Sequence, residues 1–171
     1  NFGMSLSLIQ GKKVVLVGLD VRNPRLAEYL SLNNKKGITS YLSSDEYEPS
    51  DVIINVPNLH SNLWVVPAGP IPPNPSELLL SDRLDSFFDY LRENFDYIIV
   101  DTAPVGMVSD TFSLARISDA TIYLFRADYT NKSYLKLARN LAEDGKLKKV
   151  SLVMNGTTTK TGYGYGYGEK K

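Results

Sequence analysis

The chain has 171 residues, 43% of them hydrophobic, and its 19 basic and 19 acidic side chains give a formal net charge of zero. This length suits one domain with a real core, and the balanced charge provides no overall field that would attract nucleic acid or an anionic membrane. Cysteine is absent and His60 is the single histidine, which excludes disulfides and a zinc site, and no apolar run approaches the roughly 18 residues of a transmembrane helix.

Apolar runs bounded by turn residues predict the strands of the fold. The first ten residues read as the end of a helix that begins before Asn1, and Gly11 fits a left-handed stop. Strands are then predicted at 14–17, 53–54, 63–66, 97–100, 121–125 and 150–154.

Helical stretches separate most of these strands. Helices are predicted at 24–30, from 74 to about 91, at 111–117 and at 132–143. Pro24 is expected in the first turn of its helix. Asn74, Pro75 and Glu77 are expected to form a capping box at the start of theirs. The alternation predicts an α/β fold with a parallel sheet flanked by helices on both faces and ligands at the carboxyl ends of the strands.

Asp101 directly follows the apolar run Ile98-Ile99-Val100 and precedes Thr102-Ala103-Pro104. This is the Walker B arrangement, in which the carboxylate holds Mg²⁺, usually through water. Alone, the pattern is also explained by a carboxylate that caps a turn.

Asp20 and Arg22 follow a second apolar run, Val14 to Val17. A surface Asp–Arg pair on a loop would explain them by themselves. Together with Asp101, however, two carboxylates on neighbouring strands would flank one magnesium ion, and one of them would be able to accept a proton from an attacking hydroxyl.

These motifs resemble those of the bacterial tyrosine kinases that regulate capsule and exopolysaccharide production, and the resemblance covers nearly the whole chain. It is carried by four features in the family's order: Asp20-Val21-Arg22 (Walker A′), Pro72-Pro73-Asn74-Pro75-Ser76-Glu77-Leu78-Leu79, Asp101-Thr102-Ala103-Pro104, and the tyrosines Tyr163, Tyr165 and Tyr167. The resemblance implies a P-loop NTPase-like fold related to ParA and MinD.

Two departures from the family pattern stand out. No glycine-rich Walker A loop ending in Gly-Lys-Ser or Gly-Lys-Thr occurs, so this polypeptide by itself is expected to bind ATP poorly, and the loop is expected upstream of Asn1. Gly18 stands where the family usually has the first aspartate of Walker A′. Asp20 is therefore the remaining carboxylate of that motif.

The resemblance implies ATP and Mg²⁺ as cofactors and a set of site residues. Asp20, Arg22 and Asp101 are the expected catalytic residues, with Asp101 and Asp20 on the metal. Arg22 would meet a phosphate or a neighbouring subunit, unless it is a solvated loop arginine. Asn155 is expected at adenine, although an Asn-Gly turn explains Asn155-Gly156 equally well.

After Thr157 the apolar periodicity stops and a Gly-Tyr repeat begins. We expect a kinase domain over 1–156 and a flexible autophosphorylation tail over 157–171. Fifteen residues could span on the order of 50 Å, which is enough to reach an adjacent subunit. An isolated Gly-Tyr repeat would otherwise be read as a low-complexity tail.

The resemblance further implies a ring-shaped homo-oligomer at the cytoplasmic face of the bacterial inner membrane. It also implies a membrane-embedded polysaccharide co-polymerase segment or activator as partner, and protein tyrosines as substrates, with no nucleic acid. Two alternatives remain at this point: a ParA/MinD-type ATPase switch, which has no need of a tyrosine tail, and a non-catalytic interaction module.

Overall fold

A computed structural model describes residues 1–105 and 114–157 of the chain. The chain divides into two compact units, Asn1–Ile117 and Ser118–Lys171, which we call unit 1 and unit 2. The expected boundary between a kinase domain and a tail at 156/157 is a different division, and it stays a prediction. The described helices include none with the length and apolarity that a membrane crossing requires.

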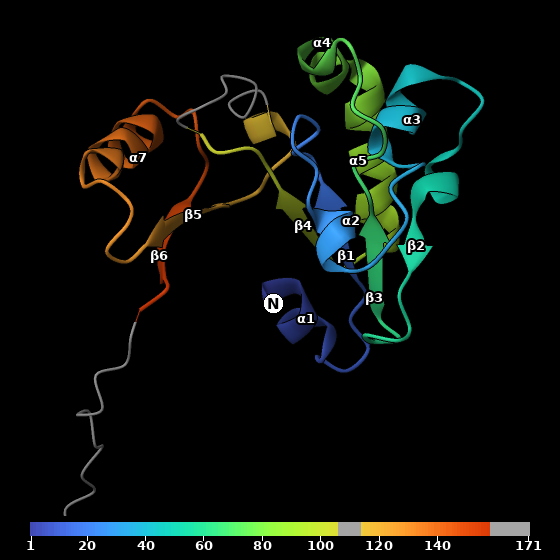
Figure 1. The fold of residues 1–171 in the computed structure, drawn as a ribbon, viewed down its shortest axis with the longest axis horizontal. Coiled ribbons are helices and arrows are strands. Elements are labelled where there is room, and N and C mark those ends of the chain that lie inside the picture. The colour runs from blue at the N-terminus through green and yellow to red at the C-terminus, as the bar shows by residue number, and fades with distance from the viewer. Residues whose placement is uncertain (106–113, 158–171) are drawn as a thin grey trace, which may run out of the picture. The chain divides into compact units, whose positions relative to one another are not determined.

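Unit 1 contains a four-stranded sheet in the order β2-β3-β1-β4 (Figure 1). Its strands are β1 (Val14–Gly18), β2 (Ile54–Asn55), β3 (Leu63–Val66) and β4 (Tyr97–Asp101). β1 pairs in parallel with both β3 and β4, which confirms the predicted parallel arrangement. β2 runs antiparallel to β3, because the short connection between them leaves no room for a crossover helix.

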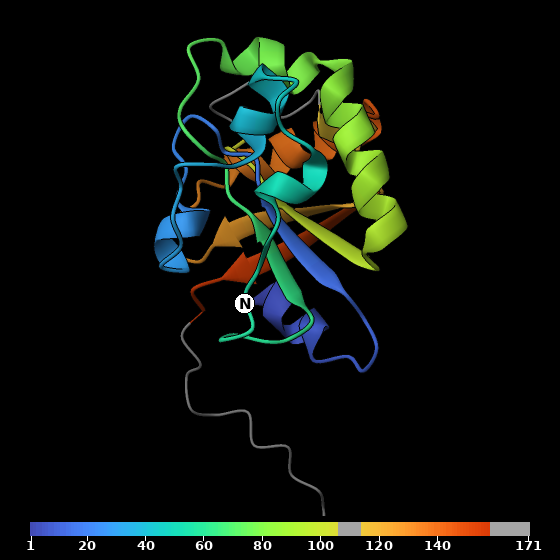
Figure 2. The same cartoon turned by 90° about the vertical axis from the view of Figure 1, so that its right-hand side faces the viewer.

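Helices cover both faces of this sheet, as predicted (Figures 1 and 2). Alternate residues of β1 point to opposite faces: Val15 and Val17 belong to one apolar cluster, whereas Val14 belongs to the other. The first cluster includes four fully buried side chains of α5 (Asp82–Asn94), and the second takes Met4 and Leu6 from the N-terminal segment that contains α1 (Phe2–Ser7).

The predicted helix from residue 74 to about 91 is in fact two helices, α4 (Pro75–Leu80) and α5. Ser81 separates them with an extended backbone, and its hydroxyl donates to the carbonyl of Leu78 at 2.8 Å. Pro75 occupies the first turn as expected. The predicted capping box is wrong: neither side chain caps the helix backbone, and the Asn74 amide donates instead to the Glu77 carboxylate at 2.7 Å.

The first loop after β1 leads to α2 (Leu26–Tyr29), a single turn. Its N-cap is Arg25, so the expectation that Pro24 lies in the first turn is wrong. Two further elements were not predicted: α3 (Ile38–Ser43) and the 3₁₀ helix η1 (Pro49–Val52). Of the helix predicted at 111–117, the described part is the 3₁₀ turn η2 (Leu114–Arg116).

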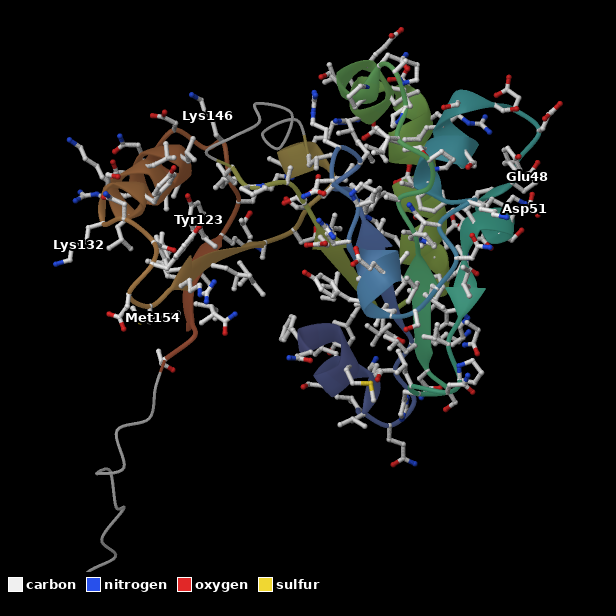
Figure 3. All side chains as sticks on the ribbon, viewed as in Figure 1. Glu48, Asp51, Tyr123, Lys132, Lys146 and Met154 are labelled. Atoms are coloured by element: carbon white, nitrogen blue, oxygen red, sulfur yellow. The ribbon has the colours of Figure 1, made fainter. Side chains whose placement is uncertain are left out.

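Unit 2 contains β5 (Thr121–Arg126), α7 (Ser133–Glu143) and β6 (Val150–Asn155), close to the predicted bounds. The two strands pair in parallel in a separate two-stranded sheet. Ala138 and Leu141 of α7 and Phe125 of β5 are its buried residues within these elements. Tyr123 of β5 stacks on Phe125, and Figure 3 labels Tyr123 together with Met154 of β6.

Candidate active site

The parallel pairing of β1 and β4 determines where the two predicted carboxylates lie. Gly18 stands opposite Asp101 in the register, and the backbone N–H of Leu19 donates to the Asp101 carbonyl at 2.7 Å. The carboxyl ends of the two strands therefore meet at the same edge of the sheet (Figure 1). Asp20 follows Gly18 by two residues, so the fold brings Asp20 and Asp101 to that edge together.

The pKa of Asp101 is raised above its ordinary value, first by burial and then by the negative charge of Asp20. Asp101 is exposed by surface area, but it sits among enough protein atoms for loss of solvation to be the larger cause. The second cause shows that the two carboxylates are close enough to repel. Asp20 and Asp101 therefore concentrate negative charge at this edge.

Asp20 is held by a local turn. One of its carboxylate oxygens accepts the backbone N–H of Asn23 at 3.1 Å, an Asx-type turn that shapes the loop after β1. This contact uses one lone pair of one oxygen and leaves the rest of the carboxylate for other donors or a cation.

Arg22 lies on the same loop and reaches α4. Its Nη2 donates to the Ser76 hydroxyl at 2.8 Å, and Ser76 belongs to the Pro-Pro-Asn-Pro-Ser-Glu motif. Arg22 is exposed, so its guanidinium remains accessible to solvent. The structure thereby joins two motifs that lie more than fifty positions apart in the sequence.

The segment that leads from β3 to the Pro-Pro-Asn-Pro-Ser-Glu motif is held by hydrogen bonds from residues that the sequence did not indicate. The Asn34 side chain donates to the Gly69 carbonyl at 2.8 Å and accepts the Gly69 N–H at 2.9 Å. The buried Thr39 hydroxyl donates to the Pro70 carbonyl at 2.8 Å. The one signal in the sequence was a pair of glycines, Gly37 and Gly69, whose backbones approach too closely for a side chain on Gly37.

The donor set fits magnesium. Mg²⁺ takes one or two carboxylates and completes its octahedron with water and substrate phosphate oxygens. Asp20 and Asp101 supply two such carboxylates, and nowhere in the described residues do three or more His, Cys, Asp or Glu side chains gather into a metal-binding group. Burial is the larger cause of the raised pKa of Asp101, and the smaller cause, the negative charge of Asp20, is what a divalent cation would relieve.

Asn155 ends β6 in unit 2. Its backbone carbonyl accepts from Ala127 at 2.8 Å, and its side-chain oxygen accepts the N–H of Gly156 at 2.8 Å, where Gly156 has a φ of 69°. This local geometry agrees with the turn that Asn-Gly favours. Contact of Asn155 with adenine stays a prediction. Tyr163, Tyr165 and Tyr167 lie outside the described residues.

Comparison with known proteins finds relatives both among curated protein sequences and among solved structures. Tyrosine-protein kinase CpsD of Streptococcus agalactiae is 33% identical over 156 residues, which are 89% of this chain and 65% of the relative. Tyrosine-protein kinase YwqD of Bacillus subtilis is 31% identical over 147 residues, 86% of this chain and 61% of that one. No protein-family model matches the chain.

Among solved structures, the chimerical protein CapA2B2 superposes with a TM-score of 0.83 at 30% identity, covering 92% of this chain and 68% of the other. The kinase domain of the Escherichia coli tyrosine kinase ETK gives a TM-score of 0.82 at 26% identity, covering 97% and 66%. A plasmid partition protein of Borrelia burgdorferi, at 19% identity and a TM-score of 0.66, shares the fold alone.

The fold and the paired strand-end carboxylates define an α/β domain with a parallel sheet, of the kind seen in the ETK kinase domain. Within that class, the chain belongs to the bacterial tyrosine kinase family. It spans about 65% of the length of the curated relatives that it matches first.

Proposed function

We propose that the whole protein is an ATP- and magnesium-dependent protein-tyrosine kinase. The observation that carries the proposal is the meeting of Asp20 and Asp101 at the carboxyl ends of adjacent parallel strands, where the charge of Asp20 helps to raise the pKa of Asp101. Relatives named tyrosine-protein kinases share about a third of their aligned residues with the chain, including CpsD at 33% identity.

Each residue at the strand ends has a proposed role. Asp101 holds the metal's hydration shell, and Asp20 shares the metal or accepts the proton of the tyrosine hydroxyl. Arg22 steadies the loop through Ser76, and its exposed guanidinium would also meet a phosphate or a neighbouring subunit. Magnesium, when bound, would neutralise charge on the phosphates. The phenol oxygen then bonds to the γ-phosphorus as the bond to the ADP oxygen breaks.

We propose that the phosphate cradle is supplied by residues outside the present sequence. The backbone donors, lysine and hydroxyl of a Walker A loop are absent from the 171 residues. Catalysis by phosphoryl-transfer enzymes depends on positioning and charge stabilisation, to which that loop contributes directly. We therefore propose that the chain alone is inactive and that a longer form with the loop is active.

The proposed acceptors are Tyr163, Tyr165 and Tyr167 of another copy in a homo-oligomeric ring. Each phosphate adds about −1.5 to −2 charges, so several on neighbouring tails would repel and loosen the ring. We place the protein at the cytoplasmic face of the bacterial inner membrane, beside a membrane-embedded polysaccharide co-polymerase segment or activator. Its output would be control of capsular or exopolysaccharide synthesis and export.

Mass spectrometry after incubation of a Walker A-containing form with Mg²⁺ and ATP tests the proposal. Phosphate is expected on Tyr163, Tyr165 and Tyr167, and is expected to disappear in the Asp101→Asn variant. Steady ATP hydrolysis without phosphate on these tyrosines would instead indicate a ParA/MinD-type ATPase. Neither hydrolysis nor transfer by the loop-containing form would indicate a non-catalytic module.

A further inference from the structure

A hollow lies in unit 1, away from the two strand-end carboxylates. It has a volume of about 300 Å³ and is lined by Lys13, Ser50, Ile53, Asn55, Trp64, Tyr90, Asn94 and Phe95. Lys13 precedes β1 and Phe95 precedes β4, so the hollow is at the amino end of these strands. Asp20 and Asp101 are at the carboxyl end, so the two sites are distinct.

Aromatic side chains form much of the wall. Trp64 and Phe95 meet edge to face, with ring centroids 5.4 Å apart and an interplanar angle of 67°. Tyr90 and Ile53 add further apolar surface, and all four side chains are partly exposed although they pack against the main core. Such a wall favours a planar apolar ring, because aromatic pairs in offset or edge-to-face geometry are stabilising beyond simple burial.

The polar lining offers one cation and carbonyl-type oxygens. Within the described part of the chain, the Lys13 ammonium has no hydrogen bond or ion pair, since the contact of Lys13 with Asp96 uses its backbone N–H. The amide nitrogens of Asn55 and Asn94 donate to backbone carbonyls, namely those of Ser61, Leu63 and Tyr90. Their side-chain oxygens are left as acceptors.

We propose that this hollow binds an unphosphorylated tyrosine ring from the Gly-Tyr repeat of another copy of the chain. A phenol fits the lining on both counts: its ring matches the aromatic wall, and its hydroxyl can accept from Lys13 and donate to an asparagine oxygen. The tail places Tyr163, Tyr165 and Tyr167 between glycines, so no neighbouring side chain obstructs entry of the ring. This inference rests on the proposed function in treating the tail as the protein's own substrate.

The hydrogen-bonding groups of the hollow favour the unmodified phenol over phosphotyrosine. A phosphate dianion has no proton to donate to the side-chain oxygens of Asn55 and Asn94, whereas the phenol hydroxyl can donate to one of them. The hollow therefore retains a tail before transfer and releases it afterwards.

Trp64 is the single tryptophan of the chain, so its fluorescence reports directly on this hollow. The experiment uses the 171-residue chain with Tyr163, Tyr165 and Tyr167 replaced by leucine, which removes competition from its own tail. A peptide of residues 160–171 is added, and Trp64 emission is followed. A saturable change is expected. The binding affinity should fall at least about tenfold for a peptide whose tyrosines are replaced by leucine, and also for the triply phosphorylated peptide.

Two adjacent lysines provide matched variants. Lys13→Gln should weaken binding of the tyrosine peptide about tenfold, because it removes a charged donor. Lys12→Gln should leave binding unchanged, because Lys12 pairs with Asp96 and does not line the hollow. An absent response at about 1 mM peptide, equal binding of the leucine peptide, or tighter binding of the phosphopeptide would overturn the inference. None of these outcomes depends on phosphoryl transfer, so mass spectrometry can support the kinase while fluorescence rejects the hollow.

Discussion

Gly18 and Asp101 stand opposite each other at the last step of the β1–β4 register, and the N–H of the next residue, Leu19, donates to the Asp101 carbonyl. The same glycine lies against the backbone that follows β3, since a Cβ on Gly18 would be 3.3 Å from the Ala68 nitrogen. Three strand ends therefore converge at one point. The position where the family usually has an additional aspartate is occupied here by the smallest residue.

Replacing Asp101 with asparagine should stabilise the metal-free protein at neutral pH. The raised pKa means that the folded state binds the proton more tightly than the unfolded state, so stability falls as pH rises through this window, and the ionised carboxylate is a cost above it. Solvent screening limits the gain to at most about 1 kcal/mol. Urea unfolding followed by Trp64 fluorescence at neutral pH and near pH 3.5 measures it, and the gain should vanish at the lower pH.

Asp96 provides the control with the opposite sign. Lys12 lowers the pKa of Asp96 through a side-chain hydrogen bond, with a backbone hydrogen bond from Lys13 as the next cause. The stability from this carboxylate is present above its ordinary pKa and is lost as pH falls. Asp96→Asn should therefore destabilise at neutral pH. If both aspartate variants shifted stability in the same direction, the electrostatic account of Asp101 would be wrong.

Gly18→Asp would restore the family's usual carboxylate and should make folding more dependent on magnesium. The added Cβ presses on the Ala68 backbone, so we expect a loss of about 1–3 kcal/mol without metal. A third carboxylate beside Asp20 and Asp101 adds repulsion that Mg²⁺ relieves. Gly18→Ala has the same steric cost without the charge, so only the aspartate variant should regain stability in a magnesium titration. Equal responses would contradict the expected metal site.

Arg22 and Ser76 should be energetically coupled, because their 2.8 Å hydrogen bond joins the loop after β1 to α4. A double-mutant cycle with Arg22→Ala and Ser76→Ala should give a coupling of about 0.5–1 kcal/mol in the free energy of unfolding. Arg25→Ala, which removes an ion pair with Glu28, serves as the matched arginine control and should be additive with Ser76→Ala. A coupling of zero for Arg22 would show that the two motifs are held together by other contacts.

Gly37→Ala should destabilise unit 1 strongly. A Cβ at Gly37 would overlap the Pro67 carbonyl and the Gly69 nitrogen, and backbone atoms in a loop fixed by Asn34 and Thr39 cannot move aside freely. We expect a loss of about 3 kcal/mol or more in urea unfolding. Gly11→Ala is the control: it has open space around it and costs only the left-handed backbone, about 1 kcal/mol. Similar losses for both would mean that packing at Gly37 is loose.

Much of the fold followed from local patterns. The apolar runs 14–17, 63–66 and 97–100 predicted β1, β3 and β4, because a strand covered on both faces must be apolar at every position. The positions of Asp20 and Asp101 just after such strands were enough to predict that they meet, since parallel strands end at one edge. The boundary at Ser81 was not predicted, because the apolar spacing continues across it while the backbone does not.

The sequence by itself determined which functional motifs the chain carries and in what order they occur: a carboxylate after each of two buried strands, a proline-rich helix start and a Gly-Tyr repeat. Only the tertiary structure decided how these parts are held. α3 owes its place to hydrogen bonds of its first residues with Pro67 and Ala68, and Arg22 finds Ser76 across the fold. Contacts between residues so far apart leave no periodic signal in the chain, because their partners are chosen by packing and not by spacing. For the same reason the sequence did not predict the aromatic hollow around Trp64, because its lining comes from separate elements that include β3 and α5.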